Sequence, residues 1–235
     1  MITPTTQPAE TPVRAALRGA RANLGPGLVL QAFAITLVLA YYGHAGTRAW
    51  FDRITVLRED LGVIFPMATT AVFGAIIPSL YLWALPETRR RQSLAKVAAL
   101  AGFWLYKGAE VDLLYRSLAA LAGADNRLGT ILTKASIDQF IYCPLWAVPT
   151  CWAMYAWVEA DLRWAPIWQD IRTAGWYRRS VLPVLISNFG VWLPAVSLIY
   201  ALPTGLQLPM QNLVLCFYTL LLVTLERRRR HGGQD

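Results

Sequence analysis

Apolar stretches alternate with short charged connectors along the chain, and their lengths indicate membrane-spanning helices. A helix needs about 20 apolar residues to cross the hydrocarbon core of a bilayer. Residues 24–42 carry no charged side chain, and residues 61–86 form a second uncharged stretch. We therefore expect a first spanning helix that begins at Asn23 or at the Gly-Pro-Gly turn of residues 25–27, and a second helix that is kinked at its internal prolines.

Four more spans are predicted from the same pattern. Residues 94–121 and 135–158 give the third and fourth spans, and the third carries charge in its second half. Residues 180–225 have no charge but are too long for one helix, so the Leu-Pro-Thr-Gly turn at residues 202–205 divides them into spans five and six. The sequence thus predicts an all-α, polytopic integral membrane bundle of about six transmembrane helices, forming a single membrane domain over residues 1–235.

The connectors carry most of the basic residues, and these gather on one side of the predicted membrane. Cytoplasmic loops are rich in arginine and lysine. Both termini are therefore predicted to be cytoplasmic, with residues 1–22 as a polar flank and residues 226–235 as a basic tail. Residues 52–60 are expected to form a mixed polar loop on the far side. The tryptophan-rich connector at residues 164–176 is expected to lie as an amphipathic segment at the interface.

Composition supports the membrane assignment and limits the other classes of function. Hydrophobic residues make up 56% of the chain and charged residues only 15%, against about 25% charged in an average soluble domain. The net charge of +8 comes from clusters between apolar stretches, so the expected partner is the lipid bilayer and not nucleic acid, while a homo-oligomer stays open. The three cysteines lie in apolar stretches and the two histidines are far apart, so no metal site and no cofactor is predicted.

The third predicted span holds charged residues at membrane depth, where ionisable groups are costly and mark function by default. Lys107 and Glu110 fall on one face of the helix, and Asp112 and Arg116, spaced i and i+4, fall on roughly the opposite face. Two interpretations remain open: one face lines a wet cavity, or both pairs only join helices. All four residues are candidates for a pore or polar core.

A second polar group opens the fourth span, after a short loop at residues 122–133. Lys134, Asp138 and Gln139 lie there, and the last two also count as polar-core candidates. Span three runs outward and span four returns, so Asp138 is expected at the depth of Arg116 and could pair with it between the helices. The alternative is that Asp138 meets only headgroups and water.

Uncharged amides are the other polar residues within the spans. Asn188, Gln211 and Asn212 are expected to hydrogen-bond a neighbouring helix, as such side chains usually do in membranes. Asn188 is in addition a candidate for the polar core. Each of the three therefore has a structural explanation that requires no ligand.

Catalytic patterns are absent from the sequence. It contains no GxSxG, no HExxH and no Walker glycine loop. Glu110 with Asp112 or Asp138 is the single carboxylate pair available for intramembrane acid–base chemistry, and nearby bases would neutralise these acids. No enzyme activity and no catalytic residue is predicted.

One group of residues resembles a known family. The pattern Lys134-x-x-x-Asp138-Gln139-x-x-x-x-Pro144 is similar to the core motif of the Mpv-seventeen / peroxisomal-membrane-protein-twenty-two family. Further residues match at the family's spacing, upstream and downstream of this motif: Gly108, Tyr115, Leu118, Asn188 and Phe189. The resemblance covers roughly residues 61–227.

The same resemblance has departures. Ala109, Asp112 and Leu114 stand where the family has proline, histidine and tryptophan, so the chain resembles a distant member. The family is described with four spans, which would make the first span here an extra N-terminal helix. The resemblance implies an integral protein of peroxisomal or inner mitochondrial membranes that forms a channel or controls the passage of small solutes.

The expected function is therefore channel-like permeation of a small solute. A non-conducting membrane scaffold or assembly factor is the alternative, and an intramembrane enzyme is the third and weakest hypothesis. The short loops and the arginine bias favour a bacterial cytoplasmic membrane, with a mitochondrial inner or peroxisomal membrane as the alternative.

Overall fold

Every regular element in the described part of the chain is a helix. The computed structural model describes residues 12–90 and 92–231, and no β-strand occurs within these two ranges. This confirms the all-α prediction. Residues 1–11, part of the predicted polar flank, and residues 232–235 of the predicted basic tail lie outside the described residues.

Helix α1 (Pro12–Gly43) runs straight through the Gly-Pro-Gly sequence that was expected to be its start. It packs along α10 (Leu182–Tyr200), and the Gln31 amide donates a hydrogen bond of 2.6 Å to the Val191 carbonyl. A Cβ atom on Gly27 would lie 2.9 Å from a Val191 methyl carbon. Both proposed starting points were wrong, because α1 already begins at Pro12; Gly27 serves close packing on α10 and does not interrupt the helix.

Helix α2 (Ala45–Leu61) occupies the segment for which a polar loop was predicted, so that prediction was also wrong. The His44 ring accepts a hydrogen bond of 3.1 Å from the Thr47 amide at the helix start, and Gly62, with φ of 56°, ends it. Phe51 and Arg58 are buried, while Trp50 on the other side is exposed. The charges that suggested a loop are the polar positions of an amphipathic helix.

The second apolar stretch forms one nearly continuous helical rod. It consists of α3 (Ile64–Ala71), the π-helical turn η1 (Val72–Ile76) and α4 (Ile77–Ala84), followed by the short α5 (Pro86–Arg89). Pro78 is the second residue after the π-helical turn, whose last hydrogen bond runs from the Ile77 amide to the Val72 carbonyl. The wider turn thus accommodates a proline that was expected to kink the helix.

The two charged spans form long helices that are joined by a shorter loop than predicted. Helix α6 (Leu94–Ala122) starts at Ser93, whose hydroxyl accepts from the Lys96 amide at 3.2 Å. The return begins as α7 (Leu128–Ile137), continues as the ten-residue π-helix η2 (Asp138–Ala147) and ends as α8 (Val148–Glu159). The loop is confined to residues 123–127, because helix α7 takes up the rest of the predicted connector.

The remaining elements follow the predicted boundaries. Helix α9 (Trp164–Arg172) buries Ile167 and exposes Trp164 and Trp168, which makes it the expected amphipathic connector. The turn η3 (Tyr177–Val181) leads into α10. Helix α11 (Thr204–His231) begins after the break at residues 201–203, where the fifth and sixth spans were expected to separate.

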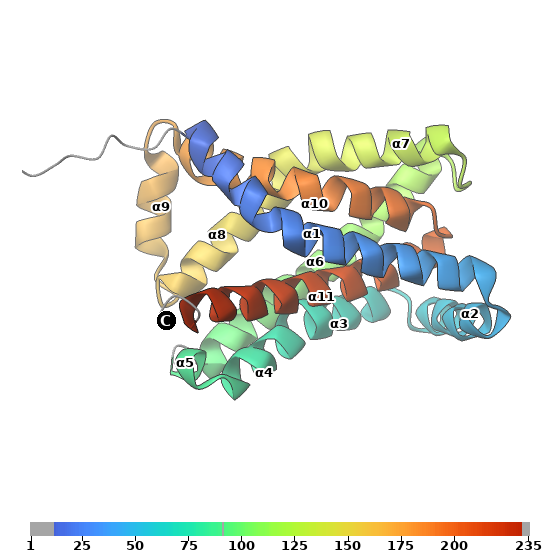
Figure 1. Cartoon of the computed structure of the whole chain (residues 1–235), viewed down its shortest axis with the longest axis horizontal. Coiled ribbons are helices and arrows are strands. Elements are labelled where there is room, and N and C mark those ends of the chain that lie inside the picture. Colours follow the sequence, from blue (N-terminus) through green and yellow to red (C-terminus); the bar gives the residue numbers. More distant parts are fainter. Residues whose placement is uncertain (1–11, 91, 232–235) are drawn as a thin grey trace, which may run out of the picture.

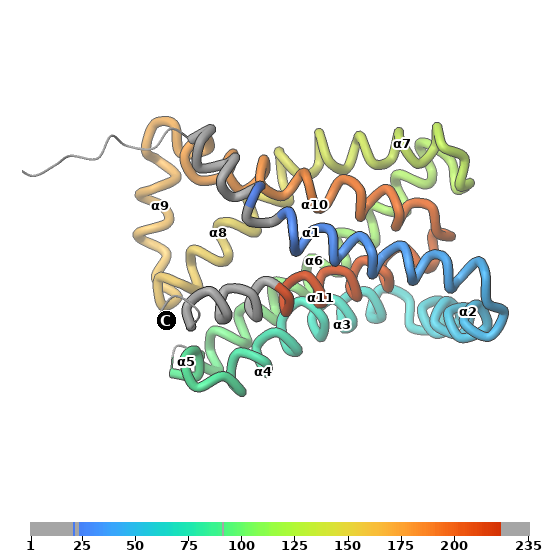
Figure 2. The backbone as a smooth tube through the Cα atoms, viewed as in Figure 1, coloured from blue at the N-terminus to red at the C-terminus, as the bar shows by residue number. Residues whose placement is uncertain are grey.

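The long helices lie side by side along the longest axis of the molecule, with the amphipathic helices at its two ends. Figure 1 shows α9 and α5 at one end and α2 at the other; α1 runs toward α2, and α11 runs away from it. The tube in Figure 2 shows the same alternation of direction in α6, α8 and α10. Three described stretches are long and apolar enough to cross a membrane: residues 24–43, 64–84 and 177–200.

The main core lies where α1, α6, α10 and α11 meet. Fully buried residues there include Leu30, Tyr115, Ile199 and Val214. Large apolar side chains such as Leu39, Leu80 and Leu145 are exposed, as residues that face lipid would be. The bundle is thus packed inside and also apolar on much of its outside.

Candidate functional site: a cavity in the bundle

A cavity of about 660 Å³ lies among α6, η2, α8, α10 and α11. Aliphatic and aromatic side chains form most of its wall, and a smaller set of polar residues contributes to it: Lys107, Asp138, Gln139, Glu159, Asn188, Gln211 and Thr219. Four of the sequence-predicted polar-core residues therefore share one cavity, although they come from three different helices. Asn188 and Gln211 contribute to the cavity wall, and not merely to helix contacts.

One end of the cavity is closed by packed side chains. The lining ends at Tyr115, Asp138 and Val196 on α6, η2 and α10. The next turn of α6 and of α10 toward the α2 end presents Leu118 and Ile199, which are fully buried. At the opposite end the lining includes Glu159, which is exposed at the C-terminus of α8 near α9. The cavity thus extends from the α9 end of the bundle to a closed end beside Asp138.

Lys107 and Glu110 form one of the two predicted pairs on α6. Lys107 is buried, and its ammonium lies 2.6 Å from Glu110 Oε1. The Tyr142 hydroxyl and the Trp146 indole N–H, the latter at 2.9 Å, also donate to the Glu110 carboxylate. Lys107 contributes to the cavity wall, whereas Glu110 does not, so this pair is a neutral unit at the edge of the cavity.

Asp138 is held by neutral donors. The Tyr200 hydroxyl donates to its Oδ2 at 2.7 Å, the Gln139 amide lies 3.3 Å from Oδ1, and the Cys143 thiol lies 3.5 Å from the same atom. Cys143 is five residues after Asp138, the spacing that a π-helix brings onto one face. The π-helix therefore aligns the carboxylate and the thiol on the cavity wall.

The π-helix itself is supported from outside. Pro149 has no N–H, so the carbonyl of Pro144, one π-turn earlier, lacks its helical donor. The Tyr177 hydroxyl donates to this carbonyl instead, at 2.9 Å. Tyr177 at the start of η3 thereby compensates for the proline near the start of α8.

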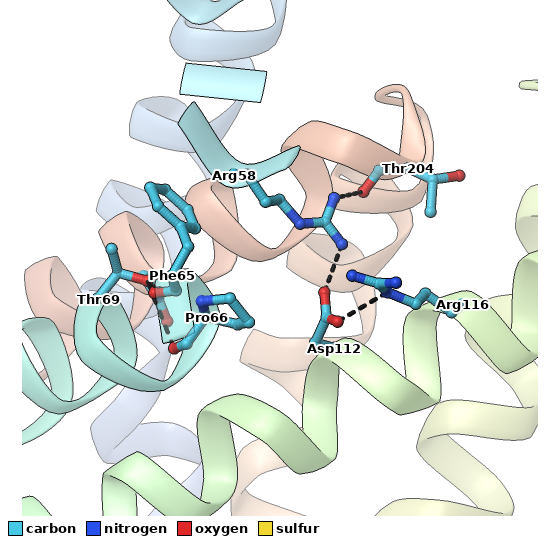
Figure 3. A network of polar contacts seen from close by, with 8 residues as sticks. Arg58, Phe65, Pro66, Thr69, Asp112, Arg116 and Thr204 are labelled. Carbon is cyan, nitrogen blue, oxygen red and sulfur yellow. Dashed lines mark hydrogen bonds and ion pairs between the residues drawn. The ribbon is translucent and has the colours of Figure 1, made fainter. Parts of the chain in front are cut away.

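Asp112 belongs to a different network, on the opposite face of α6. Figure 3 shows Arg58 of α2 donating to the Asp112 carboxylate and, at 3.1 Å, to the Thr204 carbonyl at the start of α11. The Arg116 Nε atom lies 2.7 Å from the other Asp112 oxygen. The predicted i, i+4 pair within α6 is confirmed. Together with Arg58 it forms a network outside the cavity that joins α2, α6 and α11.

The expected contact between Arg116 and Asp138 does not form, although both residues lie in the described part of the chain. Arg116 turns to Asp112 and is largely exposed, with 57% of its side chain accessible. Asp138 turns inward to Tyr200. That prediction was wrong because depth along two antiparallel helices does not fix which way each side chain faces.

The residues of the family-like motif have several roles. Tyr115, Asp138, Gln139, Asn188 and Phe189 contribute to the cavity wall. Leu118 is buried beyond the closed end, and Lys134 is buried one helical turn before Asp138. Gly108 has another function, because a Cβ atom there would lie 2.2 Å from the Pro66 carbonyl oxygen. This glycine permits the close approach of α6 and α3.

Several residues of these networks could not be singled out from the sequence. Arg58 was assigned to a polar loop, and Cys143 was expected to be a small core side chain. Tyr142 and Tyr200 stand among many aromatic residues, with no local pattern that marks them as carboxylate ligands. Proline 144 and Pro149 could have signalled an irregular fourth helix.

Among the residues whose side chains the structure describes, no group of three or more His, Cys, Asp or Glu is placed to hold a metal ion. The described residues form an all-helical bundle that contains three helices long and apolar enough to cross a membrane and one internal cavity described above. Comparison with family models, curated proteins and solved structures gives no match. The family resemblance of the motif therefore stays a prediction.

Proposed function

We propose that this protein spans a membrane and lets a small solute pass through its helix bundle. The observation that carries the proposal is the cavity of about 660 Å³, with Lys107, Asp138 and Asn188 on its wall. Polar and ionisable groups inside a membrane bundle usually mark a solute or ion path. The closed end beside Asp138 supports a closed state, because packed side chains interrupt the path toward the α2 end of the bundle.

The proposed topology has six spans, formed by α1, α3 to α4, α6, α7 to α8, α10 and α11. Helix α6 has 29 residues and therefore measures about 43 Å at 1.5 Å per residue, which is enough to cross a bilayer. The positive-inside bias supports cytoplasmic termini, with α9 on the cytoplasmic surface and α2 on the opposite one.

The proposed location is a bacterial cytoplasmic membrane, with a mitochondrial inner or peroxisomal membrane as the alternative. A distant relationship to the Mpv-seventeen / peroxisomal-membrane-protein-twenty-two family would agree with a role in permeation. It rests mainly on the Lys134, Asp138, Gln139 and Pro144 motif, together with the further residues matched at the family's spacing.

Topology is tested by single-cysteine labelling in a background free of native cysteines. Cysteine replaces either Thr47 in α2 or Thr173 after α9, two threonines at opposite ends of the bundle. An impermeant maleimide added to intact cells should label position 47 and not position 173. Equal labelling of both positions from outside would contradict the six-span topology.

Permeation is tested with the purified protein in proteoliposomes and planar bilayers. Solute flux or conductance should appear with the wild-type protein and change with Asn188→Leu, which makes the cavity wall apolar at constant side-chain size. Asp170→Asn on exposed α9 is the matched control and should behave as the wild type.

Lys107→Ala should change the flux as well, because it removes a charge from the cavity wall. Absence of flux over a range of voltages, pH values and redox conditions would contradict permeation. It would favour a non-conducting scaffold or assembly factor, for which the network of Arg58, Asp112 and Thr204 supplies rigid helix junctions.

A further inference from the structure

The charge on the cavity wall is not balanced. The Lys107 ammonium is neutralised by Glu110, 2.6 Å away. Asp138 has hydrogen bonds from Tyr200, Gln139 and Cys143, none of them a cation. No described arginine or lysine lies within ion-pair distance of Asp138, so no charge of the described residues balances this carboxyl at the closed end when it is ionised.

A cation that stands nearby in sequence does not supply the missing charge. Lys134 precedes Asp138 by four residues, and its ammonium is buried with no hydrogen-bond partner among the described residues. It does not belong to the cavity wall. Glu159 adds a second carboxylate, at the exposed end of the cavity. A bound solute would thus meet negative charge at both ends.

The wall between the two carboxylates is rich in aromatic rings. Trp104, Trp152, Trp192, Tyr155 and Tyr218 all contribute to it. The faces of tryptophan and tyrosine rings attract cations within about 6 Å, and more strongly where water is excluded. Aromatic walls also pack well against an apolar body. They favour a solute that is both cationic and hydrophobic.

An unpartnered hydroxyl lies at the closed end. Tyr115 is 1% exposed, and its hydroxyl group has no hydrogen-bond partner among the described residues, although the residue contributes to the cavity wall. Its ring lies 5.3 Å from the ring of Tyr200, which holds Asp138. Buried polar groups are nearly always satisfied in folded proteins. The Tyr115 oxygen therefore has unused lone pairs, whose partial negative charge favours a cationic centre bound at this end of the cavity.

We infer that the cavity binds an organic cation: a positively charged nitrogen or phosphorus centre on an apolar, aromatic-sized body. The charged centre lies at the closed end beside Asp138 and Tyr115, and the apolar body lies against the aromatic wall. A volume of about 660 Å³ is within the range of roughly 300–1,000 Å³ usual for sites of small organic ligands. That the cation is also the permeating solute rests on the permeation function proposed above. Binding of the cation in the cavity can be tested independently of flux.

The test compares two ions of equal shape and opposite charge. Tetraphenylphosphonium and tetraphenylborate are titrated into the full-length protein in nanodiscs of zwitterionic lipid, with empty nanodiscs as the baseline, and binding is followed by calorimetry and by quenching of tryptophan fluorescence. The cation should bind saturably at one site, and the anion should not. Equal binding of the two ions, or binding of neither, would overturn the inference.

Variants locate the site. Asp138→Asn keeps an acceptor for Tyr200 but removes the charge, and it should weaken binding of the cation about tenfold or more, as expected for a lost charged contact. Asp170→Asn, which removes a carboxylate on α9 that pairs with Arg179 and lies outside the cavity wall, should leave the affinity unchanged. Equal affinities for the wild type and a folded Asp138→Asn variant would overturn the inference.

A second variant keeps the test decisive if Asp138→Asn does not fold. Trp152→Leu retains an apolar wall but removes a ring, and it should weaken binding of the cation several-fold. An unchanged affinity would contradict the aromatic part of the site. Binding without flux would support this site and contradict permeation, whereas flux of uncharged solutes without phosphonium binding would support permeation and contradict the cation site.

Discussion

Two aspartates of this bundle are equally buried, each 4% exposed, yet the protein surrounds them in opposite ways. Asp112 receives both of its main contacts from arginines, Arg58 and Arg116. Asp138 receives hydrogen bonds from a hydroxyl, an amide and a thiol. The first carboxylate is neutralised by the fold itself, which identifies it as a structural junction. The second has no cationic partner among the described residues and lies on the wall of a cavity, so we propose that it binds a ligand.

The contrast follows the two faces of α6. One face packs closely on α3 through Gly108 and bonds α2 and α11 through Asp112. An adjoining face carries Lys107 and Leu114 and contributes to the cavity wall. Removing an interaction from the packed face should therefore affect stability, and removing one from the cavity face should affect mainly binding and flux.

The largest effect on stability is expected for Asp112→Ala. It leaves the buried Arg58 guanidinium without its carboxylate, and breaking a buried ion pair in this way costs about 3–5 kcal/mol. The unfolding midpoint in detergent, measured by thermal denaturation, should fall accordingly. Asp138→Asn is the matched comparison and should lower the midpoint far less, because no buried cation loses its partner. Similar losses for the two variants would contradict the division into junction and ligand site.

A smaller effect is expected for Gly108→Ala. The added methyl group would lie 2.2 Å from the Pro66 carbonyl oxygen and 2.8 Å from Met67 Cα, so the backbone of α6 or α3 must move. Overpacking of this kind costs about 1–3 kcal/mol. Gly102→Ala, on the same helix, is the control because nothing lies within 4 Å of its added carbon. It should be neutral or stabilising by up to about 1 kcal/mol through helix propensity. A neutral Gly108→Ala variant would mean that α6 does not depend on close contact with α3.

Tyr200→Phe addresses the cavity face. The change removes the hydroxyl that donates to Asp138 at 2.7 Å and keeps the ring that packs near Tyr115. Loss of this hydrogen bond to a charged group should cost about 1.5–3 kcal/mol if Asp138 gains no other donor, and less if water or solute replaces it. Because the bond holds Asp138 at the closed end of the cavity, its loss should change solute flux in proteoliposomes. Tyr81→Phe, outside the cavity wall, is a control for flux. Unchanged flux with a lowered midpoint would make Tyr200 a purely structural partner.

The smallest effect is expected for a third aspartate, which is exposed. The Lys96 ammonium lies 2.6 Å from Asp161, and its hydrogen bond lowers the pKa of that carboxyl. A lowered folded-state pKa contributes stability above the ordinary carboxyl pKa, and this contribution is lost as the pH falls through the folded value. Asp161→Asn should therefore change the midpoint little at neutral pH, since exposed ion pairs contribute little. The unfolding midpoints of the wild type and of Asp161→Asn should be measured from pH 8 to pH 3, and they should become equal at the acidic end of this range. A large loss at pH 7 would show that the end of α8 depends on this contact.

The sequence by itself determined the features that depend on local helix geometry. Apolar stretches of the required length predicted where the long helices lie, and the break before α11 followed from its proline and glycine. The contacts between Lys107 and Glu110 and between Asp112 and Arg116 followed from spacings of three and four residues, which place side chains on one helical face.

Only the tertiary structure decided how these helices face one another. Arg58 and Asp112 are 54 residues apart, and Tyr200 and Asp138 are 62 apart, distances at which helical periodicity carries no information. The rotation of each helix about its own axis is fixed by close packing, such as that of Gly108 on Pro66, and it turned Asp138 toward Tyr200 and away from Arg116. The cavity arises from the same rotations, since its wall combines side chains of α6, η2, α8, α10 and α11 that no local pattern connects.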